Sequence, residues 1–145
     1  MKPAAAAMTS VEGRLAEQIL SENEILFPKI MAALGCGREE VATALREVVR
    51  FLSLASQHDN GQLTPSQRVD LAWHEFILCT RAYQEFCEVH FGRMIHHDPG
   101  GPNAKHRRQF QETVRCYEQR FGSPDRRYWG GERVDPSDCG PCETI

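Results

Sequence analysis

The sequence predicts an all-α fold, a single-domain helical bundle of about four to five helices with an irregular C-terminal tail. Apolar residues recur at helical spacing, and no segment shows the alternation of apolar and polar residues that is typical of a strand. Glycine and proline clusters separate the helical segments. A length of 145 residues is usual for one domain. We therefore expect a disordered N-terminal tail over 1–9, a helical domain over 10–130 and an irregular cysteine-containing tail over 131–145.

Two short helices are expected before the first glycine cluster. Ser10 can cap a helix that runs to about Leu20, and Ser21 and its neighbours can cap a second helix, which Pro28 interrupts. The Gly35-Cys36-Gly37 sequence is a clear stop.

A third, amphipathic helix is predicted from Arg38 to about Gln57. Its apolar residues follow the helical period, and its charged residues are expected mostly on other faces. These charged residues are Glu40, Glu47 and Arg50.

The central element is predicted to be one long helix that runs from Pro65 to about Phe91. Thr64 fits the cap, Pro65 the first helical position and Gln67 the third position after the cap. Gly92 would end a helix of roughly 40 Å. Its buried stripe is expected to comprise Val69, Trp73, Phe76, Ile77, Thr80, Tyr83 and Cys87.

A loop and a last long helix follow. The loop is predicted over 95–103, which is rich in glycine and proline, and Asn103 or a neighbour can cap the helix, which ends at Gly122. Its apolar side would comprise Phe110, Val114, Tyr117 and Phe121. The remainder, including Tyr128 and Trp129, is expected to be irregular.

A candidate polar pocket lies within the central helix, where Asp70 and His74 stand four residues apart beside Trp73. Positions i and i+4 lie close together on one helix face, and Ile77 shares that face, so the pair would border the core. A buried acid and a buried imidazole need partners, because unpaired polar groups are costly there. The partner would be a metal, a substrate or another side chain.

The histidines suggest a metal as the occupant. His96 and His97 follow the glycine that ends the helix, and either could join Asp70 and His74 as a ligand. Two imidazoles and one carboxylate form the facial triad of non-haem iron sites and also suit zinc. We therefore expect a divalent metal, zinc or iron, in a possible metal-dependent oxidoreductase or hydrolase. In the alternative interpretation, Asp70 and His74 only order a helix contact. A continuous helix would also require the loop to return about 25 Å, which an extended chain can barely do.

The cysteines fall into two groups. Cys139 and Cys142 have the spacing of half a zinc site or of a redox dithiol, and could also be two free thiols. The remaining four lie in or beside predicted helices, as small buried hydrophobic residues do; they are Cys36, Cys79, Cys87 and Cys116. Because the N-terminal segment lacks the apolar core of a secretion signal, we expect a reduced, cytoplasmic protein.

Partners are less constrained. No apolar run approaches the roughly 18 residues of a membrane span, and a net charge of −3 gives no general attraction to nucleic acid. A basic surface over Lys105, Arg107, Arg108 and Arg115 leaves RNA binding conceivable, although a solvated helix face is the simpler interpretation. The alternative function is therefore a non-catalytic interaction module with a protein or RNA partner, in which the Asp/His/Trp motif is structural. An unknown small molecule is the other candidate partner.

Residues 38–130 also resemble the glycine-rich-domain-containing-protein-like family, in its short bacterial form. The resemblance rests on Val69-Asp70, Trp73-His74, Leu78, Tyr83, Cys87, Gly92, His96-His97, Pro99, Tyr117, Phe121-Gly122 and Trp129. It implies a mainly helical fold without an established reaction. It also singles out the residues named above, and we add Tyr83 and Cys87 to Trp73 as residues of the pocket.

Overall fold

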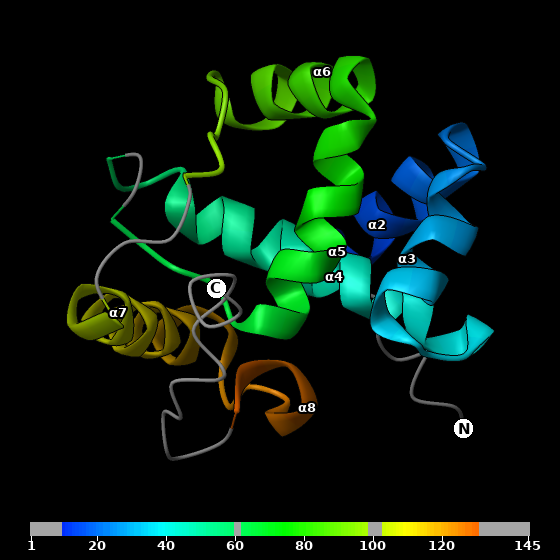
Figure 1. The fold of residues 1–145 in the computed structure, drawn as a ribbon. Coiled ribbons are helices and arrows are strands. Elements are labelled where there is room, and N and C mark those ends of the chain that lie inside the picture. The colour runs from blue at the N-terminus through cyan, green and yellow to red at the C-terminus, as the bar shows by residue number, and fades with distance from the viewer. Residues whose placement is uncertain (1–9, 60–61, 99–102, 131–145) are drawn as a thin grey trace.

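The computed structural model describes residues 10–59, 62–98 and 103–130. These residues form seven helices and no strand, so the predicted all-α fold is confirmed, with more helices than the expected four to five (Figure 1). None of the described helices has the length and apolar content needed to cross a membrane. The helices are α2 (Val11–Glu22), α3 (Leu26–Leu34), α4 (Arg38–Ala55), α5 (Gln67–Leu78), α6 (Thr80–Phe91), α7 (Asn103–Phe121) and α8 (Arg126–Trp129).

Helix α4 lies at the centre of the bundle and packs against α2, α3, α5 and α7 (Figure 1). Its apolar residues recur every three or four positions, and Val41, Leu45, Val48 and Leu52 are fully buried. The predicted amphipathic helix is therefore confirmed. Its prediction was wrong for Glu47, which is fully buried although it was expected on a solvated face.

The proline in α3 does not interrupt that helix. Pro28 lies in the first turn, two residues after Leu26, where backbone N–H groups have no partner within the helix. Proline costs little at such a position. At the other end Gly35 has φ +63, and its N–H donates to the carbonyl of Met31, which is the expected left-handed stop.

The central element is two helices, and the prediction of one long helix was wrong. Cys79, with φ −83 and ψ 69, separates α5 from α6. These angles are close to those of an inverse γ-turn. Figure 1 shows α6 turning away from α5 at this point. Thr80, expected in the buried stripe, is consequently exposed, whereas Tyr83 is buried on α6.

The start of α5 also differs from the prediction. Ser66 is the cap, and its hydroxyl accepts from the N–H of Val69 at 3.1 Å. Thr64 contacts α7 instead, where its N–H donates to Thr113 Oγ1 at 3.1 Å and its hydroxyl to Gln109 Oε1 at 2.8 Å. Thr64, the predicted cap, therefore links the segment before α5 to α7.

Two aromatic residues near the end of the described chain belong to the core. Tyr128 and Trp129 lie in α8 and are 1% and 0% exposed, so the prediction that they are irregular was wrong. The Trp129 ring stacks on Phe110 with centroids 6.3 Å apart and lies 5.1 Å from the ring of Tyr117. Helix α8 therefore closes the bundle over α7.

Candidate functional site

The site begins with Asp70 in the first turn of α5. This carboxyl group lies at the edge of the core, and only 6% of the residue is exposed. His74, one turn later, is exposed. Four residues advance a helix by one turn and about 40°, and that rotation moves His74 towards the exposed Leu71 and Leu78. The two residues are neighbours, as predicted, but only Asp70 is buried.

The partner of Asp70 is His97. Its Nε2 donates to Asp70 Oδ1 at 2.7 Å, and the two side chains are 20% and 9% exposed. This contact is possible because the chain turns at Cys79, so that α6 does not carry the following loop far along the axis of α5. The loop therefore does not have to return the distance of about 25 Å that a continuous helix would require.

Aromatic residues hold the imidazole of His97 in place. Its ring lies 4.6 Å from the ring of Trp73, centroid to centroid, and Trp73 also packs on Phe51 at 5.2 Å. Trp73 Nε1 donates to the hydroxyl of Tyr83 at 3.1 Å, and that hydroxyl donates to the carbonyl of Ile95. One hydroxyl thus joins α5, α6 and the loop that carries His97.

The same loop is fixed at its start by Arg93. Its Nη2 donates to the carbonyls of Ala55, Ser56 and His58, at 3.2, 3.1 and 2.5 Å. These carbonyls lie at or just beyond the end of α4, where helical carbonyls lack their usual N–H donor four residues later. Gly92, with φ +75, allows the chain to leave α6 towards this position.

The charge of the pair follows from its geometry. The hydrogen bond to Asp70 raises the pKa of His97 above its ordinary value, against an opposing effect of burial. His97 is therefore more readily protonated in the folded protein than in the unfolded chain. A cation that binds Asp70 and His97 must displace this proton, so its affinity would rise with pH.

The other two predicted histidine ligands, His74 and His96, do not contact Asp70 in the same way. The rings of His74 and His97 are 6.2 Å apart, and His96 is exposed. Asp70, His74 and His97 do not all bring a ligand atom within 4.8 Å of one another. The structure therefore brings together one acid and one imidazole, with a second imidazole nearby. Cys139 and Cys142 lie outside the described residues.

The described cysteines are not activated nucleophiles. Cys36, Cys79, Cys87 and Cys116 carry free thiols, and burial is the first cause that raises the pKa of each one. A thiol with a raised pKa stays protonated and reacts slowly. Cys87, a predicted pocket residue, is fully buried beside Tyr83 and acts as a small core residue.

The predicted basic surface lies on α7. Lys105, Arg108 and Arg115 are exposed and Arg107 is half-buried. Arg115 pairs with Glu112 on its own helix. RNA or protein binding by this face stays a prediction.

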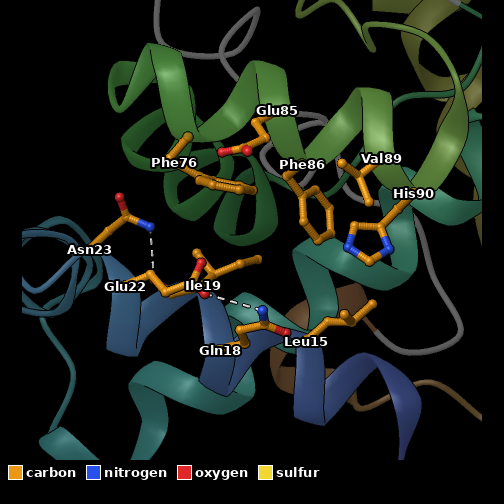
Figure 2. Close-up of a pocket in the computed structure, with 11 residues that line it drawn as sticks. Leu15, Gln18, Ile19, Glu22, Asn23, Phe76, Glu85, Phe86, Val89 and His90 are labelled. Carbon is orange, nitrogen blue, oxygen red and sulfur yellow. Dashed lines mark hydrogen bonds between the residues drawn. The ribbon is translucent and has the colours of Figure 1, made fainter.

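A cleft of about 220 Å³ lies between α2 and α6 (Figure 2). Leu15 and Ile19 face it from α2, with Phe86 and His90 opposite on α6. Neither Asp70 nor the histidines near it line this cleft, so it is separate from the predicted pocket.

Sequence reasoning missed a second polar centre at Glu47. Its Oε1 accepts from the hydroxyl of Tyr117 at 2.7 Å and from Trp129 Nε1 at 2.8 Å, while Oε2 accepts from Arg46 Nη2 at 2.6 Å. Arg50 Nη1 lies 3.6 Å from Oε2 and donates to the Tyr117 hydroxyl at 2.7 Å. All these partners except Arg46 and Arg50 are distant in the sequence, so spacing gave no signal. The arrangement satisfies the buried carboxylate and ties α4 to α7 and α8.

Comparison with known proteins identifies the family of the chain. A family model described as UCP032817-like matches residues 24–125, which is more than half of the chain and includes the Asp70–His97 pair. No curated protein and no solved structure matches. The resemblance to the glycine-rich-domain-containing-protein-like family is therefore wrong. Its Asp-x-x-Trp-His element falls within the segment that the UCP032817-like family model matches.

Proposed function

The chain belongs to the UCP032817-like family, and we propose its function from the geometry of the site. We propose that the protein binds a divalent metal, zinc or iron, through Asp70 and His97, with His74 as a third ligand. The observation that carries the proposal is the 2.7 Å contact between Asp70 Oδ1 and His97 Nε2, at a position that solvent can still reach.

The spacing of these two atoms is close to what a metal requires. Zinc binds imidazole nitrogen and carboxylate oxygen at about 2.0–2.2 Å, so two ligands of a tetrahedral ion lie roughly 3.4 Å apart. The pair would have to open by less than about 1 Å to admit the ion. Trp73 and the Tyr83–Ile95 hydrogen bond hold His97 close to this geometry before the ion arrives, and such support from surrounding groups orients ligands in metal sites.

The third ligand requires a movement of one side chain. His74 is exposed and its ring is 6.2 Å from that of His97, so a rotation of the side chain can turn a nitrogen towards the pair. His96 faces solvent on the same loop and offers a further nitrogen. A centre with three protein ligands keeps a position for water or dioxygen, which is the chemistry expected of metal-dependent hydrolases and oxidoreductases.

Histidine side-chain NMR of the full chain, titrated with zinc, tests the proposal. We expect the ring signals of His97 and His74 to shift together, along one common saturation curve. Changing His74 to alanine should weaken binding about tenfold or more without affecting folding, because the exposed ring supports no core contact. Asp70→Asn, which keeps the shape of the side chain, should weaken binding at least as much.

His90→Ala is the matched control, since His90 is also exposed and lines the separate cleft between α2 and α6 (Figure 2). It should leave the His97 titration unchanged. The pair is a structural contact, and the proposal is wrong, if His97 does not respond to zinc in the wild type. The same conclusion follows if His97 in the His74→Ala and Asp70→Asn variants responds as strongly as in the wild type.

A further inference from the structure

A second group of metal-ligating side chains lies where the end of α4 meets α7. His58, Glu112 and Cys116 each place a potential ligand atom within 4.8 Å of the other two, and all three are half-buried. Among the residues that the structure describes, this is the group of three that meets this distance criterion. It shares no residue with the Asp70–His97 pair.

Two of these residues come from one face of α7. Glu112 and Cys116 are four residues apart, and the thiol of Cys116 donates to Glu112 Oε2 at 3.6 Å. His58 follows the last turn of α4, where its N–H donates to the carbonyl of Ala55 at 3.1 Å. Arg93 donates to the carbonyl of His58, so the backbone on which the imidazole stands is held from both sides.

The imidazole of His58 is oriented as in many metal sites. Its Nδ1 lies 3.0 Å from the carbonyl oxygen of Leu54. A carbonyl can only accept, so Nδ1 carries a proton, and in the neutral ring the free lone pair is then on Nε2. A backbone carbonyl that fixes the second ring nitrogen is the usual outer contact of a metal-bound histidine.

From these contacts we propose that His58, Glu112 and Cys116 bind one zinc ion, with a fourth position open to solvent or to a small ligand. Imidazole nitrogen, carboxylate oxygen and thiolate sulfur are the three donors that zinc takes in proteins, whereas magnesium and calcium require oxygen ligands. Three protein ligands with one open position are typical of reactive zinc sites. This zinc site is additional to the proposed function, because its ligands do not include Asp70 and its test does not depend on zinc binding by Asp70.

Binding must overcome one proton and one ion pair. Burial and the neighbouring Glu112 raise the pKa of the Cys116 thiol, so zinc binding breaks the S–H bond, forms a sulfur–zinc bond and releases the proton to solvent. Arg115 donates to both oxygens of Glu112, and this largely exposed pair contributes little by itself. Zinc would share the carboxylate with Arg115 or replace it, so removing Arg115 should strengthen binding.

Cobalt(II) is the probe that separates this site from the first one. A cobalt–thiolate bond gives a charge-transfer band in the near ultraviolet, and the Asp70–His97 pair contains no sulfur. We expect the reduced 145-residue chain to show this band and to lose it as zinc is added in excess of both sites. Cys116→Ser should abolish the band, and His58→Gln and Glu112→Gln should weaken cobalt binding about tenfold or more.

Three further variants make the result decisive. Arg115→Gln should bind cobalt more tightly than the wild type, and Asp70→Asn should keep the band. The double change Cys139→Ser/Cys142→Ser should also keep it. Circular dichroism of the metal-free variants checks that each one folds, with Glu118→Gln, an exposed change on α7, as the matched control. A band that survives Cys116→Ser, that disappears in the double variant, or that never forms would overturn this assignment.

Discussion

Replacing Glu47 with glutamine should destabilise the protein much more than the same change at an exposed glutamate such as Glu39. The carboxylate is fully buried and accepts hydrogen bonds from Arg46, Tyr117 and Trp129, with Arg50 3.6 Å away. Glutamine keeps the shape and one carbonyl oxygen. Its NH₂ group, however, would face the guanidinium of Arg46, where two donors meet and no acceptor remains.

The expected cost follows from the burial of the partners. Removing one member of a buried ion pair costs about 3–5 kcal/mol, because the other charge is left without compensation. The side chains of Arg46 and Arg50 are 14% and 16% exposed, so water can partly solvate them. We therefore expect the lower limit, about 3 kcal/mol, out of a total stability of about 5–15 kcal/mol. For a domain of this size the melting temperature should fall by roughly 6–12 °C.

Urea unfolding followed by circular dichroism measures this loss directly. The midpoint should fall while the dependence of the free energy on urea stays constant, because the same surface is exposed on unfolding. Glu39→Gln is the matched control: it makes the same chemical change in the exposed first turn of α4 and should cost less than about 1 kcal/mol. If Glu47→Gln costs no more than this control, the buried network does not hold α7 and α8 on α4.

Three further predictions concern the loop that carries His97. Because Asp70 raises the pKa of His97 in the folded protein, their contact stabilises the fold most below pH 6.5, and this stabilisation is lost as the pH rises through the folded pKa. With a chelator present, the melting temperature of the wild type should therefore exceed that of Asp70→Asn most at pH 6 and least at pH 9. A difference that grows with pH would contradict this assignment of charge. Tyr83→Phe removes the hydroxyl that joins three segments and should cost about 1–3 kcal/mol in urea unfolding; no loss would show that this hydroxyl is dispensable. Arg93→Lys keeps the charge but loses the planar donor group that binds the carbonyls at the end of α4, so amide hydrogen exchange there should accelerate. Exchange at the wild-type rate would exclude a capping role for Arg93.

The helices could be predicted where apolar periodicity and glycine act together. α4 has both signals, and its predicted bounds agree with the structure within about two residues. The break at Cys79 has neither glycine nor proline, and the apolar period continues across it to Tyr83, so the sequence favours a continuous helix. Likewise, α8 is a single turn whose stability comes from the burial of Trp129, a tertiary effect that local sequence does not contain.

Both residues of the Asp70–His97 contact are indicated by the sequence, but their direct pairing is not. The spacing of Asp70 and His74 favours these two as partners, whereas the structure pairs Asp70 with His97. That pairing depends on the turn at Cys79. Because the sequence predicts a continuous helix at this position, it also predicts the wrong neighbour for Asp70. The sequence singles out Asp70 because a buried acid requires a partner, and it singles out His96 and His97 because their loop can fold back towards it.

Other polar contacts gave little signal in the sequence. Glu47 follows a helical period that also fits a solvated position, and its partner Trp129 is far away in the chain. The spacing of Glu112 and Cys116 was a usable signal, since positions i and i+4 face one another on a helix. His58 could not have been added to them, because only the packing of α4 on α7 brings it close.

The most direct test of the central claim is anomalous diffraction from crystals of the full-length protein grown with zinc, recorded at the zinc absorption edge. The account predicts a peak between Asp70 Oδ1 and His97 Nε2, at about 2.0–2.2 Å from each atom, with the His74 ring turned towards it. Crystals of Asp70→Asn should lack that peak. A wild-type structure in which these two atoms keep their direct 2.7 Å contact, with zinc only elsewhere, would contradict the proposed function.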